Sequence, residues 1–354
     1  MRDLNKDQAV GSEGAGRLFL SICIPTYNRP REFERLLKRL IPQLDERMEI
    51  VVRDDSVNHE SASIFEVLTK QKRYSTQYYK SEKIGVDAAN LFLLEKARGI
   101  FIWWFSDDDI LLGDGIQAAI EVIKSDPEIN FIWANFAYQE ISNLVMDRSD
   151  GYFKDGSDVI RSLGVNIGLM STYVVRAAIG RQGLVYARRH VRGFAFAATA
   201  VVLWVLTQPG KFYFLRGPHI LCNPTTTEEI KKATIKADGG VVNAGFVTYG
   251  IYFHDVVTGL ASHFESGAVR KLLALNFGAL WRGMLVGWVG GWDTPQGKRM
   301  RMLKLYWSYP ECWIALPIFC MPRPIVKVFY QIYKIFFTHR KFVLWDRLQT
   351  WLNK

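Results

Sequence analysis

Residues 99–113 read G-I-F-I-W-W-F-S-D-D-D-I-L-L-G, an apolar run that leads directly into consecutive acids. A short apolar run after a glycine is typical of a strand that is buried on both faces. Three adjacent carboxylates, those of Asp107, Asp108 and Asp109, repel one another unless a cation lies among them. Because open α/β sheets bind ligands at the carboxyl ends of their strands, the pattern predicts a ligand or cation site here. The alternative is an acidic turn in which Asp108 caps the next helix.

The segments around this stretch alternate between strand and helix patterns. Apolar runs rich in β-forming residues predict strands at 18–24, 48–52, 76–79 and 130–134. Apolar residues at helical spacing predict helices at 33–44, 63–70, 88–97 and 114–124. This alternation predicts an α/β fold with a mostly parallel, doubly wound sheet.

A second predicted strand also ends in acids. Residues 48–52 lead into Arg53, Asp54, Asp55 and Ser56. The carboxyl ends of parallel strands share one edge of the sheet, so we expect the two acidic segments to meet there. One of them could hydrogen-bond a base or ribose, and the other could hold a divalent ion on a diphosphate. The Gly-rich motifs of dinucleotide and P-loop sites are absent from the sequence, which disfavours those classes.

Composition limits the possible partners. The chain has 354 residues, of which 49% are hydrophobic, and a formal charge of +10. That charge favours an anionic partner, which could be a nucleic acid, a phosphate-bearing substrate or an anionic membrane surface. The four cysteines show no metal-binding spacing, which fits a reduced, cytosolic setting. No run reaches the roughly 20 apolar residues that span a bilayer, and the uncharged stretch 193–210 is expected to be a buried core helix.

Four motifs stand in a fixed order over roughly residues 18–137. They are I-P-T-Y-N-R-P at 24–30, R-D-D-S at 53–56, K-I-G-V-D-A-A-N at 83–90 and A-R-G-I-F-I-W-W-F-S-D-D-D at 97–109. In order and spacing they resemble family 2 glycosyltransferases of the GT-A fold. Within that family the chain is most similar to bacterial enzymes that add sugars to lipid-linked O-antigen or other surface-polysaccharide precursors, including the abequosyltransferase-like group. The resemblance implies transfer of a sugar from a nucleotide-sugar donor, with inversion.

The resemblance also implies a set of nucleotide-binding residues. Tyr27 would pack on the base, Asp55 would pair with the base edge, and Gly85 and Asn90 would pass under the nucleotide. The whole implied set is Pro25, Thr26, Tyr27, Asn28, Arg29, Asp55, Gly85, Asn90 and Asp107. Two positions depart from the family pattern: Ser56 replaces the usual Gly, and Ala89 replaces the usual Arg.

A divalent cation, Mn²⁺ or Mg²⁺, is implied as the cofactor. The D-x-D role falls on Asp107 and Asp109, while another register gives the key position to Asp108, so all three are candidate metal ligands. The cation would neutralise the charge that develops on the departing nucleoside diphosphate, which makes Asp108 and Asp109 candidate catalytic residues.

The catalytic base is less clear from the pattern. Inverting members use an Asp or Glu downstream of D-x-D, but no acid occurs between Asp158 and Glu228. His190 lies at about the expected distance and is the candidate base, with His219 as a second candidate. Either histidine could instead be an ordinary packed or surface residue. The Thr-rich stretch 223–240 could form a mobile lid.

The predicted organisation has three parts. Residues 1–17 are expected to be a flexible extension. Residues 18–240 would form the GT-A catalytic domain, with a nucleotide-binding half at 18–137 and an acceptor half at 138–240. Residues 241–354 would form a helical region.

The composition of the last residues of the sequence favours binding to a membrane surface. From residue 323 onward, seven Lys or Arg residues stand against the single acid Asp346. Residues 326–337 and 342–352 have the amphipathic pattern of helices that lie in the interface of an anionic membrane. The alternative is packing on the catalytic domain or in a dimer.

These patterns predict the partners and the location. The expected partners are a nucleotide-sugar donor, a lipid-linked glycan acceptor and an anionic membrane surface, and no nucleic acid is expected. The expected location is cytoplasmic, peripheral on the inner face of the cell membrane. The competing hypotheses are a degenerate transferase fold that only binds or scaffolds, and a nucleic-acid-binding protein.

Overall fold

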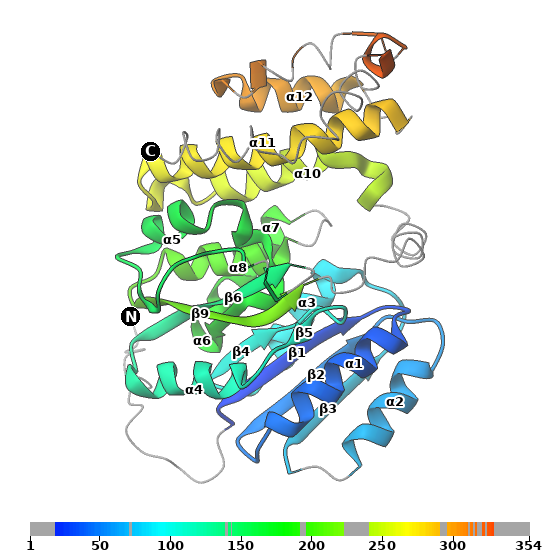
Figure 1. Cartoon of the computed structure of the whole chain (residues 1–354), viewed down its shortest axis with the longest axis vertical. Helices are drawn as coiled ribbons and strands as arrows, with labels where there is room; N and C mark the ends of the chain where they lie inside the picture. Colours follow the sequence, from blue (N-terminus) through cyan, green and yellow to red (C-terminus); the bar gives the residue numbers. More distant parts are fainter. Residues whose placement is uncertain are drawn as a thin grey trace. The chain divides into compact units, whose positions relative to one another are not determined.

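The computed structural model describes residues 18–70, 73–138, 141–142, 144–191, 196–222, 241–290, 296–310, 312–313, 316, 321–322 and 324–328 (Figure 1). The chain divides into two compact units, residues 1–238 with 252–273 and residues 239–251 with 274–354. The predicted extension, the predicted lid and the amphipathic segment 342–352 lie outside the described residues. The predicted domain boundary at residue 240 stays a prediction.

A twisted sheet forms the centre of the first unit. Within the described residues its strands are β1 (Leu20–Thr26), β2 (Met48–Asp54), β3 (Ser75–Lys80), β4 (Phe101–Trp104), β5 (Ile110–Leu111), β6 (Ile129–Tyr138), β7 (Gly151–Tyr152), β8 (Tyr173–Arg176) and β9 (Lys211–Cys222). Their order is β3-β2-β1-β4-β8-β6-β9-β5, and β7 pairs with β9. Strands β1 to β4 are mutually parallel, β8 runs antiparallel between β4 and β6, and β9 is parallel to β6. The predicted mostly parallel α/β sheet is confirmed.

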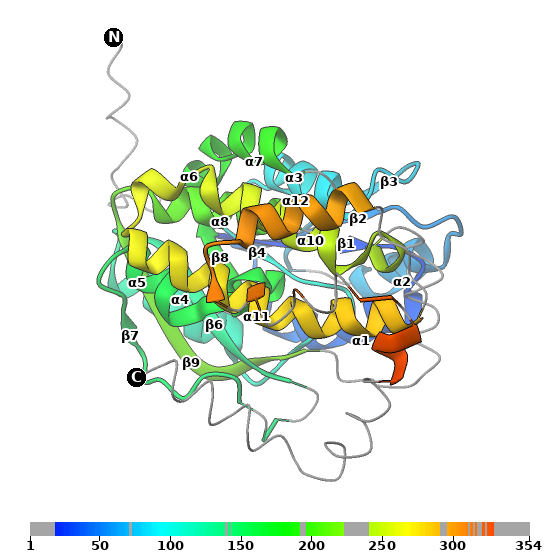
Figure 2. The ribbon, with the colours of Figure 1, turned by 90° about the horizontal axis from the view of Figure 1, so that it is seen from above.

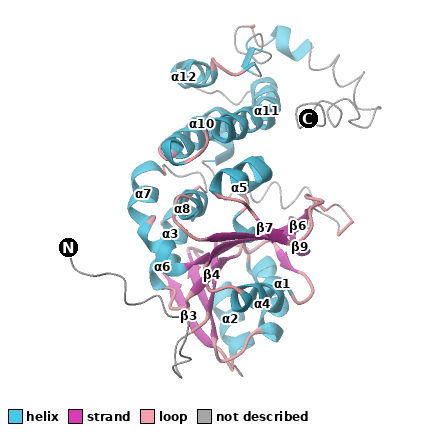
Figure 3. Cartoon of the chain, turned by 90° about the vertical axis from the view of Figure 1, so that its left-hand side faces the viewer, coloured by secondary structure: helices cyan, strands magenta, loops and turns pink. Residues whose placement is uncertain are grey.

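Helices cover both faces of this sheet. On one side lie α1 (Pro30–Leu40), α2 (Glu60–Thr69) and α4 (Gly115–Ser125) (Figure 3). On the other side lie α3 (Val86–Lys96), α6 (Ala177–Gln182) and α8 (Ala197–Leu206), with α7 (Leu184–His190) packed on α8. The view from above shows α3, α6, α7 and α8 grouped together (Figure 2). The first unit also contains α5 (Gly156–Leu163). Because helices pack on both faces of the sheet, every residue of β1, β2 and β4 is buried.

The expected core helix is confirmed. Helix α8 is buried along its whole length except at Trp204. Many of the largest buried rings lie on the strands, and the indoles of two of them donate hydrogen bonds to backbone carbonyls. The Nε1 of Trp103 donates to the Ser171 carbonyl at 2.8 Å, and the Nε1 of Trp104 donates to the Asn90 carbonyl at 3.4 Å.

One local expectation differs from the structure. The helix predicted over 33–44 ends at Leu40 and continues as a 3₁₀ turn over Ile41–Gln43. Pro42 has no backbone N–H to continue the α-helical ladder, which explains the early end. The residues before Tyr173 form the 3₁₀ turns Gly164–Gly168 and Met170–Thr172, and the strand β8 begins at Tyr173.

Helices make up the described part of the second unit. Helices α10 (Val241–Thr258) and α11 (Ser266–Gly290) have residues in both units, and α12 (Gln296–Tyr306) belongs to the second. Within that unit the Tyr306 hydroxyl donates to the Gly250 carbonyl at 3.1 Å, and its ring lies 5.0 Å from Phe277. Among the described residues, none of the helices combines the length and apolar character needed to cross a bilayer.

A buried carboxylate at the amino end of β2 yields a stability prediction. Glu49 is fully buried and accepts hydrogen bonds from the Ser21 hydroxyl, the Gln77 amide and the backbone and side chain of Arg98. Hydrogen bonds to a charged group are worth about 1.5–3 kcal/mol, so we expect Glu49→Gln to lower the free energy of unfolding by about 2 kcal/mol. Urea denaturation measures this change. Asp45→Asn, which removes a half-exposed ion pair with Arg47, is the control and should cost under about 1 kcal/mol. Equal losses in the two variants would contradict the prediction.

Candidate active site

The carboxyl ends of three adjacent strands form one edge of the sheet. Strands β2, β1 and β4 lie side by side and run parallel, so the segments that follow them converge there. Thr26, the last residue of β1, contacts both acidic segments. Its carbonyl accepts the Asp55 N–H at 3.0 Å, and its hydroxyl donates to Asp107 Oδ2 at 2.8 Å. The expectation that the two acidic segments meet at one edge is confirmed.

A guanidinium group lies between two of the three acids. Arg29 Nη1 is 3.2 Å from Asp107 Oδ1 and 2.9 Å from Asp108 Oδ2. The Ser106 hydroxyl donates to the second oxygen of Asp108, and Arg35 Nη2 donates to the Asp108 carbonyl at 2.9 Å. The positive charge of Arg29 therefore offsets the repulsion between the two carboxylates.

Burial changes the titration of Asp107. Its side chain is almost fully buried, and this desolvation raises the pKa of Asp107 from its ordinary value to about 7. The charge of Arg29 and the hydrogen bond from Thr26 oppose this rise, whereas the charge of Asp108 adds to it. Asp107 consequently changes its charge near neutral pH.

The third acid takes part in a different set of contacts. Asp109 Oδ2 accepts the Ser171 hydroxyl at 2.5 Å, and the same hydroxyl oxygen accepts the Ser106 N–H at 2.9 Å. The buried thiol of Cys222 also lies against Asp109, and burial together with this carboxylate raises the pKa of Cys222. The structure thus groups Asp107 with Asp108 around Arg29, and ties Asp109 to the residues before β8 and at the end of β9.

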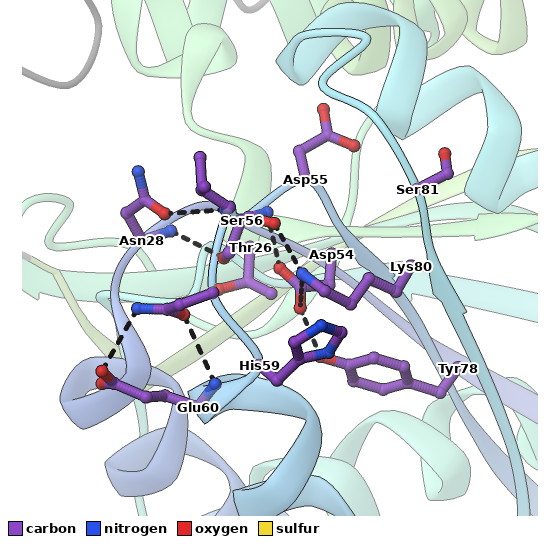
Figure 4. A network of polar contacts seen from close by, with 12 residues as sticks. Thr26, Asn28, Asp54, Asp55, Ser56, His59, Glu60, Tyr78, Lys80 and Ser81 are labelled. Carbon is purple, nitrogen blue, oxygen red and sulfur yellow. Dashed lines mark hydrogen bonds and ion pairs between the residues drawn. The ribbon is translucent and has the colours of Figure 1, made fainter.

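The two acids at the end of β2 point in opposite directions (Figure 4). Asp54 accepts hydrogen bonds from the Tyr78 hydroxyl at 2.7 Å and from the Ser56 N–H at 2.8 Å. Asp55 Oδ1 accepts Arg53 Nε at 2.8 Å. Asp55 Oδ2 accepts two backbone N–H groups, those of Ile84 at 2.9 Å and Gly85 at 3.0 Å. Gly85 has φ 86°, a conformation that glycine adopts without strain, so Asp55 joins β2 to a tight turn before α3.

The loop after β1 is held by the same strand end. The Asn28 N–H donates to the Ser56 hydroxyl at 2.8 Å, and Asn28 Oδ1 accepts the Val57 N–H at 3.2 Å (Figure 4). The unusual serine at position 56 therefore has a structural role that glycine could not fill. Lys83 Nζ lies 3.8 Å from the centre of the Tyr27 ring, which brings the turn before α3 over the predicted base-stacking residue. Pro25, also in the predicted set, lies within β1.

Asn90 has a buried side chain that lacks hydrogen bonds. It is 1% exposed, and both amide atoms are without a hydrogen-bond partner among the described residues. Leaving such a group unpaired is costly, and most buried amides are paired. Asn90 is thus suited to bind a polar ligand group, which agrees with its predicted role in the nucleotide site.

The histidine predicted as the base stacks on a tyrosine of its own helix, α7. The ring of His190 stacks on Tyr186 with 4.2 Å between centroids, and its Nδ1 lies 3.0 Å from the Tyr186 carbonyl. The Tyr186 hydroxyl donates to the Val256 carbonyl of α10. His219 lies on β9, and burial lowers its pKa. The role of either histidine as the base stays a prediction.

Three residues that contact the site, or lie next to it, were not among the predicted site residues. Arg53 and Ser171 orient Asp55 and Asp109 respectively. Asp87, within the motif at 83–90, contacts the first turn of α8. Arg53 and Asp87 belong to the motifs at 53–56 and 83–90, which were the available signal for them.

The acids of this edge fit a divalent cation. No cluster of three or more His, Cys, Asp or Glu side chains that could hold a metal occurs in the part of the chain that the structure describes. Oxygens of Asp107 and Asp108 nevertheless converge on one nitrogen of Arg29, a position already suited to positive charge. Carboxylate oxygens suit Mg²⁺ and Mn²⁺, and such sites usually use one or two carboxylates plus substrate phosphates.

Comparison with known proteins identifies the domain. Residues 21–173 match the family model Glycosyl transferase family 2, a segment that contains the whole edge described above. The predicted resemblance to family 2 glycosyltransferases is confirmed over these residues.

The relatives in sequence are bacterial. The chain is 26% identical over 144 residues to a GalNAc(5)-diNAcBac-PP-undecaprenol beta-1,3-glucosyltransferase of Campylobacter jejuni, which covers 40% of this chain and 45% of the relative. It is 28% identical over 117 residues to an abequosyltransferase of Salmonella typhimurium, which covers 32% of this chain and 34% of the relative. The chain spans between 17% and 45% of the length of the curated relatives it matches.

The solved structures are similar over most of the chain. Staphylococcus aureus TarS, residues 1–349, aligns with a TM-score of 0.55 at 14% identity and covers 89% of this chain and 91% of TarS. A mannosyltransferase from Pyrobaculum calidifontis in complex with GDP-Man and Mn²⁺ aligns with a TM-score of 0.52 at 12% identity, and covers 96% of this chain and 86% of that protein. These similarities support the GT-A fold.

Proposed function

We propose that this chain is a metal-dependent, inverting glycosyltransferase that moves a sugar from a nucleotide-sugar donor to a lipid-linked glycan acceptor during synthesis of a bacterial surface polysaccharide. The observation that carries the proposal is the meeting of Asp55 with Asp107 and Asp108 across Thr26, inside a family 2 domain. One acid is placed to read a base, and the other two are placed to act on a diphosphate.

Each group at this edge has a role in the proposed reaction. Tyr27 stacks on the base and Asp55 accepts a hydrogen bond from its edge. Asp107 and Asp108 would hold a divalent cation, which when bound neutralises charge on the leaving diphosphate. Arg29, which contacts both acids, moves from them to a donor phosphate oxygen. The buried amide of Asn90 hydrogen-bonds the nucleotide.

The acceptor and the location rest on other observations. The name of the Campylobacter relative includes an undecaprenol-linked pyrophosphate, and the Salmonella relative is an abequosyltransferase. The formal charge of +10 and the basic residues after position 323 favour an anionic surface. Of that terminal segment, residues 324–328 are described, and there Ile325 and Val328 are 45% and 60% exposed. We therefore place the protein at the inner face of the cell membrane, with its donor taken from the cytoplasm.

One observation favours a second candidate function. The sequence has no acid between Asp158 and Glu228, the interval in which inverting relatives are expected to carry the base. A chain that has lost its base would bind a nucleotide sugar without transferring the sugar.

Incubation of the full chain with a panel of nucleotide sugars tests both functions. The acceptors are lipid-linked oligosaccharides extracted from bacteria, and the reactions contain Mn²⁺, Mg²⁺ or EDTA. Mass spectrometry should detect one added sugar with one donor, and EDTA should abolish the addition. Nucleotide binding without any transfer would favour the second function, and absence of both binding and transfer would overturn the proposal.

A pH dependence follows from the raised pKa of Asp107. Its protonated form is favoured below about pH 7, and a neutral carboxyl group attracts a cation less strongly. We expect the affinity for Mn²⁺ with nucleoside diphosphate to fall as the pH is lowered from 8 to 6, as measured by calorimetry. Thr26→Ala removes a hydrogen bond that stabilises the carboxylate, so it should move the midpoint to higher pH. A midpoint that moves to lower pH would contradict this explanation.

A further inference from the structure

We propose that Asp87 is the catalytic base that accepts the proton of the acceptor hydroxyl. This inference rests on the proposed function and deepens it, because it assigns a step for which the sequence pattern provides no acid.

Helices α3 and α8 both begin at the edge of the sheet that carries Asp55 and Asp107. Helix α3 follows β3, which is parallel to β2, so its first turn lies at the carboxyl edge. Helix α8 precedes β9, which is parallel to β6 and enters the sheet at the opposite edge. A helix of 10 residues is about 15 Å long, which returns the start of α8 to the carboxyl edge. The two helices pack against each other (Figures 1 and 2).

The Asp87 side chain joins the two helix starts. Its Oδ1 accepts the N–H of Ala197, the first residue of α8, at 2.8 Å. These residues are 110 positions apart in the sequence. Asp87 is 8% exposed, so its carboxylate is largely shielded from water. The positive end of the α8 dipole favours the ionised carboxylate, which is the form that a base needs.

This contact lies in the interval that lacks acids. Ala197 is located between Asp158 and Glu228, where the sequence has no Asp or Glu. Asp87 therefore brings a carboxylate from an earlier helix to the start of the segment in which the base was expected. It does so without any acid in that segment.

The same face of α3 belongs to the donor site. Gly85, two residues before Asp87, donates its N–H to Asp55 Oδ2. Asn90 follows Asp87 by three positions and so projects from the same face of the helix. Its buried amide has no hydrogen-bond partner among the described residues, which indicates that a ligand group completes this face. Asp87 thus lies between a residue that binds the base-reading acid and a residue suited to bind the donor.

The proposed step balances without any further reactant. The acceptor hydroxyl oxygen forms a bond to the anomeric carbon of the donor sugar as its proton passes to an Asp87 carboxylate oxygen. The bond from that carbon to the diphosphate oxygen breaks, and the nucleoside diphosphate leaves with the electron pair. Asp87 then releases the proton to water.

Asp87→Asn separates catalysis from structure. An asparagine carbonyl oxygen can still accept the Ala197 N–H, so the contact with α8 and the fold should persist, whereas the amide cannot accept a proton. General bases contribute about 10²–10⁴-fold, so kcat should fall by at least about 100-fold. The affinity for the donor nucleotide and the melting temperature should stay unchanged. Asp87→Glu, which retains a carboxylate, should recover part of kcat.

A second acid on the same helix provides the control. Glu95 of α3 pairs with Arg188 and is exposed, so Glu95→Gln should transfer sugar at the wild-type rate. Transfer by Asp87→Asn within threefold of wild type would overturn this inference and leave the proposed function intact. So would a loss that appears only as weaker donor binding, or a drop in kcat with His190→Gln at least as large as that with Asp87→Asn. A wild-type chain that binds donors but never transfers sugar would overturn the proposed function and this inference together.

Discussion

Asp108→Asn is expected to lower kcat/KM for sugar transfer by about 1,000-fold, or about 4 kcal/mol of transition-state stabilisation. The substitution removes one of the two carboxylates that converge on Arg29, and with it a proposed ligand of the cation on the diphosphate. Asp108 is 31% exposed, so its loss should affect the fold little. Initial rates at saturating Mn²⁺, together with a thermal melt, measure both effects.

Asp109→Asn is the matched comparison, because the two acids are adjacent. Asp109 accepts a hydrogen bond from the Ser171 hydroxyl, whereas the ion pairs of Arg29 described above are with Asp107 and Asp108. We expect its substitution to lower the melting temperature and to keep kcat/KM within about tenfold of wild type, since hydrogen bonds to a charged group contribute about 1.5–3 kcal/mol to stability. A larger kinetic loss with Asp109→Asn than with Asp108→Asn would instead favour the register in which Asp107 and Asp109 hold the metal.

Asp55→Asn is expected to raise the dissociation constant for the preferred nucleoside diphosphate by about 100-fold, or about 2.7 kcal/mol. The carboxylate proposed to pair with the base also holds Arg53 and two backbone N–H groups. An amide in its place puts an NH₂ group against these donors, so the turn at Gly85 should loosen as the base contact is lost. The preference among uridine, guanosine, cytidine and thymidine diphosphates should shrink at the same time, which calorimetry with each nucleotide would show.

Tyr78→Phe controls for a general effect on the end of β2. It removes the hydrogen bond to Asp54, whose side chain points away from Asp55 (Figure 4). We expect lower stability with unchanged nucleotide affinity. Equal weakening of nucleotide binding by both variants would contradict the separation of roles between the two acids.

Arg29 explains how this edge tolerates adjacent acids. The cation that three carboxylates require was predicted to be a metal ion, yet the chain supplies a guanidinium from the loop after β1. This arrangement keeps the two carboxylates convergent in the absence of a donor. A divalent cation could replace the guanidinium of Arg29 with little rearrangement of the acids, because both are positively charged and both interact with carboxylate oxygens.

The local sequence pattern was sufficient to predict most of the strands and helices. Buried strands appear as short apolar runs, and helices appear as apolar residues at helical spacing, so β1, β2, β4 and α8 were all predicted close to their positions. The convergence of Asp55 and Asp107 at one edge also followed, because parallel neighbours must end on the same side. Helix α1 ends earlier than the leucine spacing predicts, because Pro42 has no backbone N–H to continue the helix.

Local sequence patterns could not predict the contacts between segments that are distant in the chain. Whether Asp108 or Asp109 shares a cation with Asp107 depends on side-chain directions after β4, which Arg29 and Ser171 determine from segments 78 and 62 residues away. The meeting of Asp87 with the start of α8 depends in the same way on how two helices pack across 110 residues. Residue type and spacing encode which elements form and which way they run, because those properties are local. The pairing of charges in the site is set by packing, which brings together groups whose separation in the chain carries no signal.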